Sequence, residues 1–103
     1  MAIELTTEKF DEFIKKGTVL IDFHAHWCMP CVIMSPIVDE IGKKFRDKLK
    51  VGKINVDENH EIAQKYNVRS IPTFILFKDG KIKEQFVGAV SKEKFEEEIK
   101  KQL

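Results

Sequence analysis

Apolar and polar residues alternate along this chain in blocks that predict five β-strands. The run TVLIDF at 18–23 is almost continuously apolar and β-branched, which is typical of a buried central strand. IPTFILF at 71–77 is a second strongly apolar run. Shorter strands are expected at 3–5, 49–56 and 81–87. In the last of these, Ile82, Glu84 and Phe86 are expected to share one face, because alternate residues of a strand point the same way.

Helical periodicity fills the segments between these strands. Apolar residues recur every four positions from Ile33 to Phe45, which predicts a helix from residue 29 or 30 to about 48, kinked at Pro36. Three shorter helices are expected. The first starts at Thr6 or Thr7, one of which would cap it, and ends at residue 17; the others cover 59–66 and 91–102. Asp79-Gly80 predicts a type I′ hairpin turn between the last two strands.

The predicted order is therefore β-α-β-α-β-α-β-β-α. Such alternation favours an α/β sandwich whose sheet is mainly parallel in its first half, with an antiparallel pair at the end. The chain has no repeats, no low-complexity tracts and no Ser/Gly/Pro linker. We expect a single domain over residues 1–103.

Composition narrows the functions open to this chain. Of 103 residues, 43% are apolar, enough for one core, and 34% are charged, with a net charge of +1. This balance gives no electrostatic footprint for nucleic acid or an anionic membrane. No apolar run approaches the roughly 20 residues that span a bilayer. The start, MAIELTTEKF, lacks the layout of a signal peptide, so we expect a cytoplasmic protein.

Both cysteines lie in HAHWCMPC at residues 24–31, between a buried strand and a helix. Three kinds of site are open to them. A structural disulfide across three residues would add only roughly 2 kcal/mol by chain entropy. A metal site would have to recruit His24 and His26, with no loop to fold them around a tetrahedral ion.

A redox centre suits the pattern better than either alternative. A thiolate at a helix N-terminus is stabilised by unpaired N–H groups and the positive end of the helix dipole, which makes Cys28 the attacking sulfur. Cys31, one turn further and expected to be more buried, would resolve a mixed disulfide. Pro30 suits a first helical turn because it has no N–H to leave unbonded.

Five segments in order resemble the thioredoxin family over nearly the whole chain. They are VLIDFHAHWCMPC, SPIVDEI, VGKINVDEN, VRSIPTFILFKDGK and FVGAVSKEKFEEEI. The resemblance implies a central mixed sheet of about five strands flanked by four helices. It also implies reduction of protein disulfides, no tightly bound cofactor or metal, recycling by thioredoxin reductase or a ferredoxin-linked reductase, and a monomer.

The resemblance also implies individual roles. Cys28 matches the family's nucleophile and Cys31 its resolving thiol. Asp22 matches a buried aspartate, whose pKa burial should raise so that it exchanges a proton with Cys31 through water. Lys53 matches the lysine that pairs with this aspartate, although an ordinary surface lysine would give the same pattern. Pro72 matches a cis-proline facing the disulfide.

A flat apolar rim for docking the client protein is implied as well. Its residues are Trp27, Met29, Pro30, Val56, Ile71, Gly88 and Ala89.

Three residues depart from the family's usual pattern. His24 stands where an aromatic residue is usual, Met29 stands where glycine is usual, and His26 lies two residues before the nucleophile. Protonated His24 or His26 near Cys28 would stabilise its thiolate and make the protein more oxidising. A disulfide-forming or isomerising variant and a metal-binding scaffold therefore remain alternatives to a reductase.

Overall fold

The computed structural model describes residues 2–103, and its nine elements follow the predicted order. The strands are β1 (Ile3–Leu5), β2 (Thr18–His24), β3 (Leu49–Asn55), β4 (Thr73–Lys78) and β5 (Lys81–Val87). The helices are α1 (Thr7–Ile14), α2 (Met29–Lys44), α3 (His60–Lys65) and α4 (Lys92–Lys100). None of the helices described is long and apolar enough to cross a membrane.

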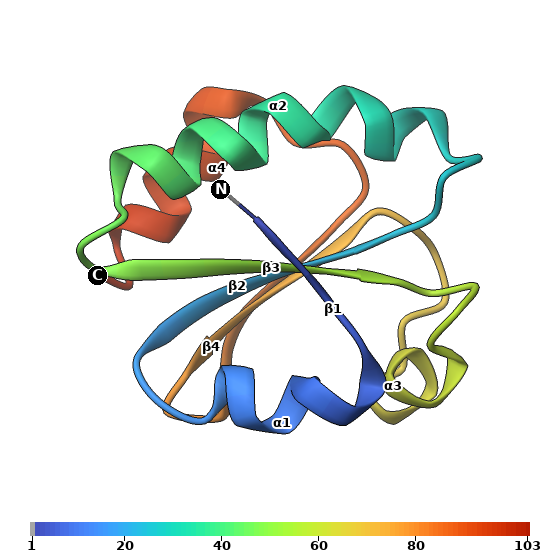
Figure 1. The fold of residues 1–103 in the computed structure, drawn as a ribbon. Coiled ribbons are helices and arrows are strands. Elements are labelled where there is room, and N and C mark those ends of the chain that lie inside the picture. Colours follow the sequence, from blue (N-terminus) through green and yellow to red (C-terminus); the bar gives the residue numbers. More distant parts are fainter. Residues whose placement is uncertain (1) are drawn as a thin grey trace.

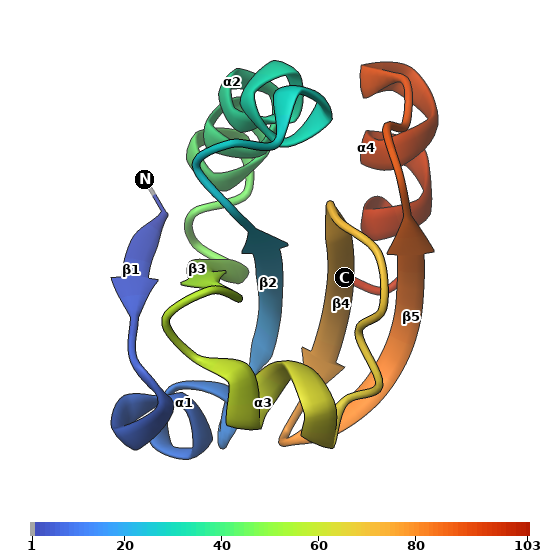
Figure 2. The ribbon, with the colours of Figure 1, turned by 90° about the vertical axis from the view of Figure 1, so that its right-hand side faces the viewer.

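The five strands form one mixed sheet in the order β1-β3-β2-β4-β5 (Figure 2). β1, β3 and β2 are parallel, whereas β4 and β5 are antiparallel to their neighbours. The continuously apolar run of β2 occupies the centre, as predicted, and six of its seven residues are buried. The expected mixed α/β sheet with four flanking helices is confirmed.

Helices cover both faces of the sheet, with α2 and α4 on one side and α1 and α3 on the other (Figure 1). Two apolar cores result, one on each face. Leu20 packs in the core under α2, while Val19 and Ile21 pack in the opposite core. Because side chains alternate along a strand, Asp22 and His24 share the α2 face with Leu20. This alternation places two polar groups of β2 under the helix that carries the cysteines.

Thr6 is the N-cap residue of α1, one of the two threonines predicted, but its side chain makes no capping bond; the Asn59 carboxamide oxygen accepts from the Thr7 N–H at 2.9 Å instead. Two other local predictions were wrong. The α2 helix ends at Lys44, four residues earlier than expected. The β4–β5 ladder shifts register after Leu76, so Ile82 lies on the opposite face from Glu84 and Phe86 and is half exposed.

Candidate active site

Cys28 and Cys31 form a disulfide where β2 gives way to α2. Cys28 is the N-cap residue of α2, and its Sγ accepts a hydrogen bond from the Cys31 N–H at 3.3 Å. Pro30 occupies the first turn, as the sequence predicts. The Cys28 sulfur therefore meets the free N–H groups and the positive end of the α2 dipole, which stabilise a thiolate.

The expectation that Cys31 is more buried than Cys28 was wrong. The two residues are 5% and 4% exposed, because the disulfide holds both sulfurs in one apolar cluster with Ala25. The surroundings of the two cysteines differ instead. Cys31, but not Cys28, lines a cavity that lies behind the disulfide.

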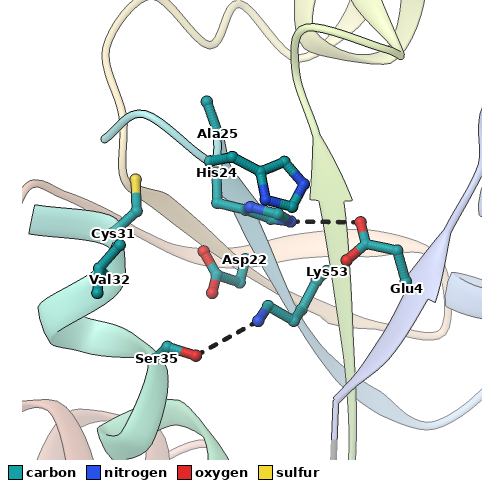
Figure 3. Close-up of a pocket in the computed structure, with 9 residues that line it drawn as sticks. Glu4, Asp22, His24, Ala25, Cys31, Val32, Ser35 and Lys53 are labelled. Atoms are coloured by element: carbon teal, nitrogen blue, oxygen red, sulfur yellow. Dashed lines mark hydrogen bonds and ion pairs between the residues drawn. The ribbon is translucent and has the colours of Figure 1, made fainter. Parts of the chain in front are cut away.

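This inner cavity has a volume of about 220 Å³ and lies between α2 and the three parallel strands (Figure 3). Its walls are Glu4, Asp22, His24, Ala25, His26, Cys31, Val32, Ser35 and Lys53. Most of these side chains are polar, and the space is large enough for several water molecules. The cavity reaches the surface, because Glu4 and His26 are exposed. Cys31 can therefore exchange protons with groups inside the protein through water.

Asp22 is the most buried ionisable group of the cavity. It is 1% exposed, and its Oδ1 has no hydrogen-bond partner among the residues that the structure describes. Burial, the largest cause, raises the pKa of Asp22 from 3.8 to about 7, with smaller contributions from Glu4 and Asp39, while the positive charge of Lys53 opposes the rise. Such a carboxyl gains and loses a proton near neutral pH.

Lys53 lies beside Asp22 in the β2–β3 register, and Glu4 lies beside Lys53 in the β1–β3 register. The three charged residues therefore form one row across the sheet, on its α2 face. The Lys53 ammonium donates a hydrogen bond to the Ser35 hydroxyl of α2 at 3.4 Å. Lys53 is thus a half-buried cavity residue rather than an ordinary surface lysine.

His24 is buried at the end of β2, with its Nε2 3.3 Å from Glu4 Oε2. Burial, the largest cause, lowers the pKa of His24 from its usual 6.5, against the opposing effect of Glu4. The His24 ring is therefore mainly neutral at pH 7. His26 is exposed, and its ring lies edge-on to the His24 ring, with 5.9 Å between the ring centroids.

The residues expected to dock a client do not all have the same surroundings. Trp27 and Met29 are 71% and 65% exposed, and Pro30 and Ala89 are exposed as well. Val56 and Ile71 pack against the cysteine cluster.

The peptide bond between Ile71 and Pro72 is cis, which confirms that expectation. The Pro72 carbonyl accepts from the Gly88 N–H at 2.8 Å, so the segment after β5 is tied to the start of β4. Gly88 has φ +87°, a conformation that favours glycine.

Three residues at the site were not predicted from the sequence. Asp57 accepts a hydrogen bond from the Trp27 indole N–H at 2.7 Å. Ser35 accepts a hydrogen bond from the Lys53 ammonium, and the Glu4 carboxylate is bonded to the His24 ring. No local pattern marks any of them, since each meets its partner through the register of the sheet or the packing of α2. Across residues 2–103, no three His, Cys, Asp or Glu side chains gather in a group that could hold a metal ion.

Comparison with known proteins agrees with this geometry. The thioredoxin family model matches residues 1–101. A thioredoxin of Bacillus subtilis is 44% identical over 101 residues, which cover 98% of this chain and 97% of that protein. A thioredoxin of Pseudomonas aeruginosa is 45% identical over 92 residues (87% and 85% covered), and one of Rickettsia bellii is 49% identical over 90 residues (85% and 86%). The chain therefore belongs to the thioredoxin family of thiol–disulfide oxidoreductases, which need no cofactor.

Proposed function

We propose that this protein is an electron carrier that reduces disulfides of client proteins, with Cys28 as the nucleophile. The Cys28 thiolate attacks one sulfur of the client disulfide, and the other leaves as a thiolate that takes a proton from water. Cys31 then loses its proton and attacks Cys28, which releases the second client thiolate and closes the Cys28–Cys31 disulfide. The observation that carries this assignment is the N–H of Cys31 donated to the Cys28 sulfur at the start of α2.

Asp22 is the group we assign to the second step. Cys31 lines the inner cavity together with Asp22, and a pKa of about 7 lets this carboxylate accept the Cys31 proton through water. Lys53 sets how readily it does so, because its positive charge favours the carboxylate form. The two protonation states of Asp22 are therefore close in free energy at the pH where the reaction runs.

The client chain is proposed to lie across the exposed side of the cysteine pair. Trp27, Met29 and Pro30 offer apolar surface before and within the first turn of α2. Ile71 and Pro72 offer the backbone that precedes β4, along which an extended client strand can pair. The remaining rim residues are Val56, Gly88 and Ala89.

His26 is the histidine that we propose to tune the redox potential. It is exposed and lies two residues before Cys28, so a positive charge on it would favour the thiolate. The same role was expected of His24, but its ring is buried, mainly neutral at pH 7 and bonded to Glu4. We therefore assign His24 a smaller part in tuning.

The setting of this reaction follows from its chemistry. A reductase must be re-reduced after each turnover, so we propose thioredoxin reductase or a ferredoxin-linked enzyme as its electron donor. A compartment that keeps thiols reduced suits this cycle, and we propose the cytoplasm. We further propose that residues 1–103 form one domain that acts as a monomer.

Trapping the mixed disulfide tests the two cysteine roles. Cys31→Ser should accumulate a covalent adduct with a disulfide-containing client such as insulin, because nothing resolves it. Cys28→Ser should give far less adduct under the same conditions. Equal trapping by both variants, or trapping by Cys28→Ser alone, would overturn the assignment.

A further inference from the structure

Asp22 has no direct contact with bulk water, yet its proposed role requires it to exchange protons. It is 1% exposed, and residues from several elements surround it: Glu4 of β1, Lys53 of β3, Cys31 and Asp39 of α2, and His24 of its own strand. At pH 7, hydronium alone would reach a carboxyl only about 10² to 10³ times per second, since encounter is limited to about 10⁹ to 10¹⁰ M⁻¹ s⁻¹. Because hydronium cannot touch the buried Asp22 carboxyl directly, its exchange would be slower still unless a proton path connects it to a group at the surface.

We propose that His24 and Glu4 form a proton relay between the buried Asp22 carboxyl and bulk solvent. The proposal rests on the role of Asp22 assigned above. Asp22 and His24 line the same polar cavity, and Figure 3 shows the His24 ring bonded to Glu4 on the side of the cavity away from Cys31. The Glu4 side chain is 56% exposed, so the path ends in water.

Each proton transfer in the relay balances. The Asp22 carboxylic acid releases its proton to cavity water, which passes it to the free nitrogen of the neutral His24 ring. The imidazolium then gives the proton on Nε2 to the Glu4 carboxylate, which loses it to solvent. The reverse sequence reprotonates Asp22, and no electron moves in either direction.

Charge and burial support this direction of transfer. The pKa of His24 lies below its usual value because of burial, so the ring has a free nitrogen near pH 7, where Asp22 titrates. The groups that face His24 are Glu4, Lys53 and His26. Lys53 is unsuited as a carrier, because its ammonium offers only donors and is already bonded to Ser35. Glu4 is the carboxylate bonded to the ring.

The direct test is the proton-exchange rate at the Asp22 carboxyl, measured by ¹³C NMR relaxation dispersion near pH 7 in weak buffer. Oxidised protein is used, so that no thiol chemistry interferes. Glu4→Gln should slow the exchange at least about fivefold, because an amide cannot take up the proton. Glu8→Gln, which removes the same charge from an exposed position on α1, should leave the rate unchanged.

His24→Ala separates proton transfer from a structural role. This variant should also slow exchange at least about fivefold, and millimolar imidazole should restore the rate by occupying the space left by the ring. Imidazole should not restore Glu4→Gln. His26→Ala should retain most of the original rate. If His24→Ala does not fold, Glu4→Gln still decides the question, since Glu4 is a surface residue.

Unchanged exchange in both Glu4→Gln and His24→Ala would overturn the relay, since Asp22 would then exchange directly with cavity water. Slow exchange in His24→Ala without imidazole rescue would also overturn it, because His24 would then only shape the cavity. A larger effect of His26→Ala than of His24→Ala would place the path elsewhere. The trapping experiment above tests the cysteine roles separately, so either idea can fail alone.

Discussion

Asp22 and Lys53 lie side by side in the β2–β3 register, yet the Lys53 ammonium is hydrogen-bonded to Ser35 and Asp22 Oδ1 has no partner among the described residues. Lys53 therefore acts on Asp22 through its charge and not through a bond that would fix the carboxylate. Burial outweighs that charge, and the pKa of Asp22 rises to about 7. The proposed second step of the reaction depends on this balance.

Asp22 should destabilise the protein at high pH. Its folded-state pKa lies above the ordinary 3.8, so the folded state holds the proton more tightly and loses stability as pH rises from about 4 to about 7. Asp22→Asn should therefore raise the free energy of unfolding at pH 8 by on the order of 4 kcal/mol and change it little at pH 4. Urea unfolding of both oxidised proteins at the two pH values measures this. An equal change at both would contradict the pKa assignment.

Removing the charge of Lys53 should raise the pKa of Asp22 further. Among the described residues, Lys53 is the one whose charge lowers the pKa of Asp22. Lys53→Met should therefore move the titration of the Asp22 carboxyl, followed by ¹³C NMR, to higher pH. Lys50→Met provides a charge-matched control, because Lys50 is exposed on the same strand and three residues away. A shift of the same size in the control would show that net charge, and not this pairing, sets the pKa.

Replacing His24 and His26 together with alanine should lower the fraction of Cys28 present as thiolate, because a protonated imidazole near the sulfur would favour the thiolate. Thiolate absorbance at 240 nm measures that fraction. We expect His26→Ala to account for most of the change, since the His24 ring is mainly neutral. If the absorbance matches that of a His60→Ala control, His24 and His26 do not affect the fraction of Cys28 present as thiolate.

Asp57 should help to orient Trp27 for docking. Asp57→Ala removes the acceptor of the indole N–H, a bond worth about 0.5–1.5 kcal/mol, and kcat/KM for insulin reduction should fall about two- to tenfold. Glu58→Ala removes the adjacent exposed carboxylate and should leave kcat/KM within about twofold. If neither the fluorescence of Trp27 nor kcat/KM changes in Asp57→Ala, Asp57 does not position Trp27.

The sequence was sufficient for features that depend on neighbours along the chain. The unbroken apolar run of β2 predicts its central place, and the strand period puts Asp22 and His24 on one face. The hairpin at Asp79-Gly80 was predictable because both residues tolerate positive φ, and both adopt it. The cysteine spacing and Pro30 likewise locate the start of α2.

Features that depend on tertiary placement were not predictable. Glu4 meets His24 only because β3 lies between β1 and β2 and fixes the register of both, and nothing local to IEL indicates this. The register shift after Leu76 has no glycine to mark it, so the simple alternation misplaced Ile82. The similar burial of the two cysteines follows from their shared cluster with Ala25.

The midpoint potential of the Cys28–Cys31 pair tests the central claim, that this chain reduces protein disulfides, most directly. It is obtained by equilibrating the protein with defined redox buffers and quantifying oxidised and reduced forms. We predict a value close to about −270 mV, the value known for thioredoxin itself. A value of about −180 mV or higher, in the range of disulfide isomerases and oxidases, would contradict the proposal and indicate a disulfide donor.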